Sequence, residues 1–590
     1  MVQKFIIGVA CGFYLFTSAM PARAALTVTQ PTAATVVAAG DDYATQVLGN
    51  AWDMNDAVDI DTEESQYVSP QAFASGVFSG TTTANGANIY PLFMGYASSV
   101  NLSRGANFPI DTSHYRYVTY KLRVNQASQP QFTRVVGIVD GGSYGATPKA
   151  TVVESLFTAQ LPNNVWTIVS FDMVTNNDNQ FYHWTDFPQL TGLRIDPATT
   201  NAAGAYAGVQ FNIDWIRLTA PATAAQKTNV QWTDSGSATT YTVSAIDAGS
   251  VSYVLGSGLS GTSYLADTSF LSPGQYTIKV TRNSDSVSAS SGTFRINNPA
   301  AIAMTAPSVR GEQSLNFAQT IVGNPWGPIT ASDFVPGIGV RNFTNVSYTN
   351  PAGSFYGRPI NGDPGWFFNL GGQTINTSLY RSLCFTLEVF GQRSVGGGSV
   401  ARLFWGPSTG VLTTSLPIPL DTGLSEYCIA DVAAYAPDPA APASGGTWSS
   451  AAQAALRMDP DELTPANGCG TPQTCFDVQL NSLILSPFAH ANPNYTFAWT
   501  LNDTDNSSVT LSLALDADTT PGNGNEFQIY SQLVSNGAGT FAWPGTATIP
   551  SGTYHVLATV DDGVNVVNQY AGGVIIVTSD DIFRNGFETP

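Results

Sequence analysis

The sequence is poor in the residues that most enzymes use for chemistry. It has four histidines, His114, His183, His490 and His555, each in a different segment. It has no HExxH motif, P-loop or dinucleotide fingerprint, which excludes the commonest zinc, phosphate and dinucleotide sites. The GPSTG stretch, residues 406–410, fits GxSxG, but strand-like segments flank it, so Ser408 is expected in a hairpin turn rather than at a nucleophile. The two catalytic carboxylates of a glycoside hydrolase come together only in the folded protein, so the sequence leaves this possibility open.

Long apolar runs are also missing. The run from Phe5 to Phe16 is too short to span a membrane, and no other stretch approaches the roughly 20 apolar residues required. With Lys4 before this run and Ala22-Arg23-Ala24 after it, residues 1–24 are predicted to be a signal peptide cleaved before Ala25. We therefore expect an exported protein, secreted or at the cell surface, without a membrane span.

Charged residues make up only 11% of the chain, and basic ones are scarce. The mature chain would carry 20 basic and 42 acidic residues, a formal net charge of −22. Nucleic acid and anionic membranes are disfavoured as partners, because association depends on charge complementarity. Abundant Gly, Ser, Thr, Asn and aromatic residues, with short apolar runs between turns, are typical of an extracellular all-β protein.

Cysteine is rare. Cys11 leaves with the signal peptide, and the other four allow three pairings in an exported chain. Cys384 and Cys428 lie in strand-like segments, and Cys469 and Cys475 bracket a short loop. We predict the disulfides Cys384–Cys428 and Cys469–Cys475, since the spacing does not match paired CxxC zinc knuckles.

The chain contains one long unit that occurs twice in succession. YATQVLGNAWDM from Tyr43 recurs as FAQTIVGNPWGP from Phe317, and three further segments recur in the same order at offsets between 263 and 274. The smaller segments that follow also match, for example LSPGQYTIKV with IPSGTYHVLA. Each unit is expected to contain a larger domain and a smaller one.

The fold predicted from these patterns is all-β, with tandem β-sandwiches. Two larger jelly-roll-like domains, residues 25–220 and 299–490, alternate with two smaller immunoglobulin-like or fibronectin III-like domains, residues 221–298 and 491–578. Residues 579–590 form a C-terminal tail. Short alternating strands and the near absence of helical periodicity support this division.

Three resemblances follow from these segments. The GNAWDM and GNPWGP stretches, the YRYVTYKLRV strand and the FNIDWIRL strand resemble galactose-binding-like jelly rolls, the fold of many carbohydrate-binding modules. The last domain resembles immunoglobulin-like domains of secreted bacterial proteins. The ending DDIFRNGFETP resembles acidic IFxxGFE tails of exported Gram-negative proteins, which implies a sorting tag; an amphipathic tail docked on the last domain is the alternative.

Two acidic stretches could hold structural calcium, because carboxylate and amide oxygens are its usual ligands. The first contains Asp53, Asp56, Asp59, Asp61, Glu63 and Glu64, and the second copy keeps only Asp333 there. The second stretch contains Asp516, Asp518, Asn523 and Glu526. The alternatives are a solvated acidic loop and a polar strand connection.

Aromatic residues among turn residues could stack on sugar rings. The aromatic candidates are Tyr182, Trp184, Trp366 and Trp405, and Asn369 is the polar residue expected to flank Trp366. The alternative for each is a core residue beneath a loop. The leading hypothesis is a non-catalytic protein that binds extracellular polysaccharide or a cell-surface ligand. The alternatives are a structural or adhesion protein and an unrecognised polysaccharide hydrolase or lyase; burial of Trp184 and Trp366 would favour the structural role.

Overall fold

The computed structural model describes most of the chain after residue 24. The described residues are 25–55, 57–60, 67–83, 92–95, 110–125, 130–138, 152–178, 182–190, 192–199, 207–236, 240–349, 352–360, 363–390, 399–415, 418–420, 423–435, 446–460, 477–491, 494–545 and 549–578. The predicted signal peptide and the C-terminal tail lie outside them.

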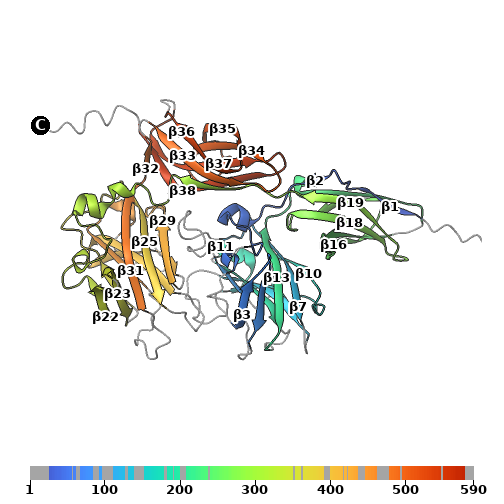
Figure 1. The fold of residues 1–590 in the computed structure, drawn as a ribbon, viewed down its shortest axis with the longest axis horizontal. Coiled ribbons are helices and arrows are strands. Elements are labelled where there is room, and N and C mark those ends of the chain that lie inside the picture. The colour runs from blue at the N-terminus through green and yellow to red at the C-terminus, as the bar shows by residue number, and fades with distance from the viewer. Residues whose placement is uncertain are drawn as a thin grey trace, which may run out of the picture.

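The fold is all-β, as predicted, with four separate sandwiches (Figure 1). The strands of the first larger sandwich are β3 (Val68–Phe73), β4 (Phe78–Thr82), β5 (Leu92–Gly95), β6 (Ile110–Asp111), β7 (Tyr117–Asn125), β8 (Phe132–Ile138), β9 (Val152–Glu154), β10 (Thr167–Asp172), β11 (Gln189–Leu190), β12 (Gly192–Thr199) and β13 (Gln210–Thr219). One sheet has the order β10-β7-β13-β4-β3, and the other β5-β12-β8-β9.

The second larger sandwich repeats this plan. Its strands are β21 (Val340–Arg341), β22 (Phe343–Thr349), β23 (Ala352–Pro359), β24 (Gly365–Phe367), β25 (Tyr380–Phe390), β26 (Ser399–Ser408), β27 (Val411–Thr414), β28 (Ile418–Leu420), β29 (Gly423–Ile429), β30 (Ala455–Asp459) and β31 (Asp477–Pro487). One sheet has the order β22-β23-β31-β25-β29, and the other β21-β24-β30-β26-β27, with β28 paired to β26. Ser408 ends β26 opposite Val411 of β27, in the expected hairpin.

The smaller sandwiches also contain two sheets each. The first consists of β1 (Leu26–Gln30), β2 (Val36–Val37), β14 (Lys227–Asp234), β15 (Tyr241–Asp247), β16 (Ser252–Leu259), β17 (Ser263–Asp267), β18 (Gly274–Arg282) and β19 (Ser288–Ile296). The second consists of β20 (Ala301–Ala306), β32 (Ala489–Ala491), β33 (Tyr495–Asn502), β34 (Ser508–Asp516), β35 (Phe527–Ser535), β36 (Gly537–Trp543), β37 (Gly552–Asp561) and β38 (Val566–Val577). The sheet orders are β1-β14-β17 and β16-β15-β18-β19-β2 in the first, and β20-β33-β36 and β32-β38-β37-β34-β35 in the second.

The structure moves the domain boundaries. Strand β1 pairs with β14, with Val28 opposite Trp232, so the blue strand β1 lies beside green strands of the smaller sandwich in Figure 1. Strand β20 pairs with β33 in the same way, with Met304 opposite Trp499. The expected boundaries assigned both strands to the larger domains because they precede them in the chain. Each larger sandwich is instead inserted after the first strands of a smaller one.

The GNxW segment is scaffold in both copies. It follows a single helical turn, η1 (Ala44–Leu48) or η8 (Ala318–Val322), and its glycine ends that turn with φ of 74° at Gly49 and 75° at Gly323, a conformation that favours glycine. The asparagine that follows donates to a buried aspartate: Asn50 to Asp59 at 2.8 Å and Asn324 to Asp333 at 2.7 Å.

The other short helices are single turns in connections. They are η2 (Ala57–Asp59), η5 (Trp184–Asp186), η6 (Ala224–Gln226), η7 (Gln313–Leu315), η9 (Ala331–Asp333) and η10 (Trp448–Ser450). Within the described ranges, no helix is long and apolar enough to cross a membrane.

Candidate functional site

The three tryptophans predicted to stack on sugars lie in the core. Trp184, Trp366 and Trp405 are each 0% exposed. Trp184 donates from Nε1 to the carbonyl of Tyr115 at 2.8 Å, and the ring of Trp366 stacks on Phe343 with centroids 5.2 Å apart. None of the three presents a ring face to solvent, so the structure corrects their assignment as sugar platforms. Burial of such rings contributes to sandwich stability.

The other two candidates lie nearer the surface. Tyr182 is 43% exposed and packs edge-on against Phe187, with centroids 5.0 Å apart. Asn369 is part-buried, and its side chain serves the local turn: Oδ1 accepts from the Gly371 amide at 3.0 Å, and Nδ2 donates to the Ser332 carbonyl at 3.2 Å. The five predicted residues therefore do not form one site.

The two described aspartates of the first acidic stretch lie in different environments. Asp59 is 2% exposed and holds Asn50, as Asp333 holds Asn324 in the second copy, so it is a scaffold residue. Asp53 is exposed and accepts from the Asn55 amide at 3.2 Å. Asp56 and Asp61, like Glu63 and Glu64, lie outside the described residues.

The second acidic stretch is a loop that satisfies its own carboxylates. Asp518 accepts from Asn523 and Asn525, and Glu526 accepts from the backbone amides of the turn at Gly522, Asn523 and Gly524. Asp516, 0% exposed, accepts from the Tyr570 hydroxyl. No cluster of three metal-binding His, Cys, Asp or Glu side chains occurs in the part of the chain that the structure describes.

The disulfide Cys384–Cys428 forms as predicted, between directly opposed residues of β25 and β29. Both sulfurs lie beside buried Val309, in the chain that enters the second larger sandwich. The first copy has Thr119 and Ser170 at the corresponding register, with their hydroxyl oxygens 2.7 Å apart. Cys469 and Cys475 lie outside the described residues, and their pairing stays a prediction.

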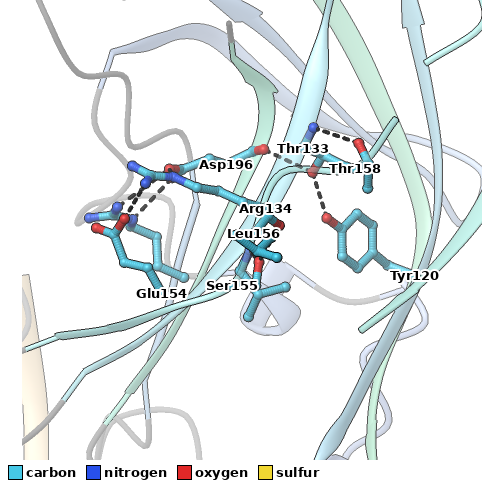
Figure 2. A network of polar contacts seen from close by, with 10 residues as sticks. Tyr120, Thr133, Arg134, Glu154, Ser155, Leu156, Thr158 and Asp196 are labelled. Atoms are coloured by element: carbon cyan, nitrogen blue, oxygen red, sulfur yellow. Dashed lines mark hydrogen bonds and ion pairs between the residues drawn. The ribbon is translucent and has the colours of Figure 1, made fainter. Parts of the chain in front are cut away.

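A polar network on the second sheet of each larger sandwich was not predicted. Figure 2 shows Arg134 reaching from β8 to Glu154 of β9 and to Asp196 of β12, with Arg134 Nε 2.8 Å from Asp196 Oδ2. Arg194 contacts the other oxygen of Asp196 at 3.0 Å. Burial raises the pKa of Glu154, although Arg134 opposes this. These carboxylates are engaged by arginine rather than open to a ligand.

The second copy keeps the centre of this network. Arg457 binds Asp459 within β30, Asp363 joins them, and Arg402 lies opposite Asp459 on β26. The sequence signal was visible in the repeated LR-x-DP stretches, residues 193–197 and 456–460. We interpret the network as a structural feature that both copies share. In each copy an arginine on the adjacent strand lies opposite a buried aspartate, and its charge offsets the cost of removing that carboxylate from water.

The junction within the first unit is held by two buried cations. Lys121 Nζ lies 2.7 Å from a carboxylate oxygen of Asp214 in the same sandwich and of Asp247 in the smaller one. Arg217, 4% exposed, donates to the carbonyls of Gly40, Ser269 and Leu271. Its donors therefore join the larger sandwich to the smaller one.

Apolar contacts complete this junction. Ile168 and Trp215 of the larger sandwich belong to the same buried cluster as Val230 and Trp232 of the smaller one. Burial also raises the pKa of Asp42, beside Arg217, with the guanidinium opposing the shift. Two side chains of the larger sandwich thus extend the core of the smaller one across the boundary.

Comparisons with known proteins give no family. No family model and no curated protein matches the chain. Among solved structures, a β-1,2-glucanase from Parabacteroides distasonis is 14% identical with a TM-score of 0.16; the alignment covers 43% of this chain and 39% of that one. The CBM51-2 and INT domains of Clostridium perfringens ZmpB are 8% identical, with a TM-score of 0.11 and coverage of 52% and 90%.

A third similar structure is the BSP domain of a biofilm associated protein. It is 10% identical, with a TM-score of 0.13 and coverage of 86% of this chain and 63% of that one. Fibronectin, carbohydrate-binding and surface-protein domains thus occur among the similar structures. At these TM-scores the similarities carry no argument for a specific activity.

Proposed function

We propose that this chain is an exported, non-catalytic surface protein with a structural or adhesive role. The observation that carries the proposal is the insertion of one sandwich into the chain of another in each unit. A larger sandwich is inserted after the first strands of a smaller one, and in the first unit buried Arg217 and Lys121 close the junction. The chain crosses this junction twice, and Ile168 and Trp215 of the larger sandwich pack into the core of the smaller one. Both features favour a fixed orientation of the larger sandwich over free rotation.

The placement of the predicted binding residues supports the same role. Buried Trp184 and Trp366 serve packing, and burial of both was the outcome expected for a structural protein. The carboxylates of Glu154 and Asp196 are neutralised by arginine, which supports the non-catalytic proposal. Recognition of polysaccharide is the second candidate, favoured by Tyr182 with its 43% exposed ring.

Adhesion can be measured directly with beads coated with the mature chain, residues 25–590. We expect these beads to resist detachment by flow from polystyrene and from one another more strongly than albumin-coated beads. The Tyr182→Ala variant and an excess of soluble polysaccharides should leave the detachment force unchanged. Inhibition by a glycan together with loss in Tyr182→Ala would replace the structural role with glycan recognition. Detachment at the albumin level would contradict adhesion.

A further inference from the structure

A cavity of about 410 Å³ lies where three of the sandwiches meet. The first larger sandwich contributes Trp52 and Asp53, the first smaller one contributes Gln275 and Arg295, and the second smaller one contributes Thr504 and Asp505. This volume falls in the range of roughly 300–1,000 Å³ that is usual for small-molecule sites, and domain junctions are a frequent place for them.

Hydrogen bonds hold the second smaller sandwich, which contributes Thr504 and Asp505 to the cavity, against the first unit. The Asn298 amide donates to Asp505 at 2.7 Å, and Asn298 Nδ2 donates to Thr504 Oγ1 at 2.8 Å. Nearby, Asn297 donates to Asp562 at 2.9 Å, and Asn565 accepts from the backbone amide of Ala39 at 2.8 Å. The second smaller sandwich is therefore docked on the first unit, and the cavity has a defined shape.

The lining offers both donors and acceptors. Arg295 Nη1 lies 3.2 Å from Asp505 Oδ1, a contact that occupies one of the five N–H donors of a guanidinium. Asp505 and Asp53 supply carboxylate oxygens, and Gln275 adds an exposed side-chain amide. Opposite charges around the cavity disfavour a ligand with a strong charge of its own. They suit hydroxyl groups, which donate to carboxylates and accept from guanidinium.

The apolar part of the lining combines tryptophan with isoleucine and proline, for example Ile296 and Pro273. Trp52 and Trp215 are 4% and 7% exposed, and both border the cavity. A neutral sugar combines an apolar ring face with a rim of hydroxyl groups, which suits this mixture of tryptophan and charged or amide groups. The size, the mixed charge and the partly apolar border together indicate one or two sugar rings.

The second unit repeats Trp52 as Trp326 but does not repeat Asp53, Trp215 or Arg217. The ladder registers place Ser482 at the position of Trp215 and Ile484 at the position of Arg217. In the aligned GNxW segments, Gly327 stands where the first copy has Asp53. The cavity is therefore a feature of the first unit and not a by-product of the repeated scaffold.

We propose that this junction cavity binds one neutral mono- or disaccharide. The site is separate from the proposed structural role and from Tyr182. A bound sugar would contact three sandwiches at once, so it would also strengthen the docking of the second smaller sandwich on the first unit. Free energy from such a ligand adds to the stability of the docked state.

The test is isothermal titration of the mature chain with glucose, galactose, mannose, maltose, cellobiose and lactose, with glucuronic acid and glucosamine as charged controls. We expect one-to-one binding of at least one neutral sugar. The Gln275→Trp variant, which fills the cavity from an exposed position, should weaken that binding at least tenfold. Thr553→Trp is the matched control, because Thr553 is also exposed and occupies the corresponding position in the second smaller sandwich.

Each outcome decides the proposal. Binding that Gln275→Trp removes and Thr553→Trp retains supports the cavity. Binding that survives Gln275→Trp places the sugar elsewhere and overturns the proposal. Absence of heat and of a thermal shift with every neutral sugar overturns it as well, and so does binding confined to the charged controls.

Discussion

The side-chain amide of Asn324 lies 2.7 Å from the carboxylate of Asp333, which is 1% exposed. Asn50 makes the same contact with Asp59 in the first copy. The recurring GNxW segment therefore fixes the start of each larger sandwich, because its asparagine donates a hydrogen bond to a buried aspartate nine residues later.

The first prediction concerns this contact. Asn324→Ala removes a donor from a buried carboxylate, so we expect the second larger sandwich to lose about 1–3 kcal/mol of unfolding free energy. Gln319→Ala, at an exposed position of the preceding turn, should change it by less than about 0.5 kcal/mol. Urea unfolding measures both variants. Equal stability of the two would show that the contact does not matter.

The second prediction separates packing from binding at Trp184. Its ring is 0% exposed, so Trp184→Ala should destabilise the first larger sandwich by about 3–5 kcal/mol. Tyr182→Ala, two residues earlier and 43% exposed, should cost less than about 1 kcal/mol. Thermal unfolding tests the pair. A Trp184→Ala protein with wild-type stability would contradict the core assignment.

The sequence was a good guide to the fold class, the duplication and the disulfide Cys384–Cys428, because these depend on local alternation and repeated segments. It could not show that β1 pairs with β14, since that pairing joins strands about 200 residues apart. Burial of Trp184 and Trp366 was equally hidden, because turn residues around an aromatic are compatible with a core ring or an exposed one. The networks around Asp196 and Asp459 were visible only as the repeated LR-x-DP signature.

The third prediction transfers the disulfide between copies. Thr119 and Ser170 are opposed as Cys384 and Cys428 are, so Thr119→Cys with Ser170→Cys should form a disulfide in the first larger sandwich. Oxidation should stabilise it by about 2–4 kcal/mol over the reduced form. The comparison is made with Cys384 and Cys428 both changed to serine. Thiols that stay titratable after oxidation would contradict the shared register.

The fourth prediction is a pH dependence in the first smaller sandwich. Arg282 hydrogen-bonds Asp234 and lowers the pKa of its carboxyl to about 2, from 3.8. A carboxyl whose pKa is lower in the folded state stabilises that state at pH values above its pKa in the unfolded chain. This contribution is lost as the pH falls from about 4 to 2. Asp234→Asn should therefore flatten the stability profile in this window. Asp285→Asn, the 47% exposed partner of the same arginine, should leave the profile unchanged.

The fifth prediction tests the fixed arrangement that underlies the proposed role. Small-angle X-ray scattering of residues 25–578 should match the arrangement of the four sandwiches in Figure 1 as one body. Arg217→Ala removes donors to three carbonyls across the first junction and should broaden the distance distribution. Arg310→Ala, whose 49% exposed side chain pairs with Glu426, should not. A wild-type curve that requires independently moving sandwiches would contradict the account.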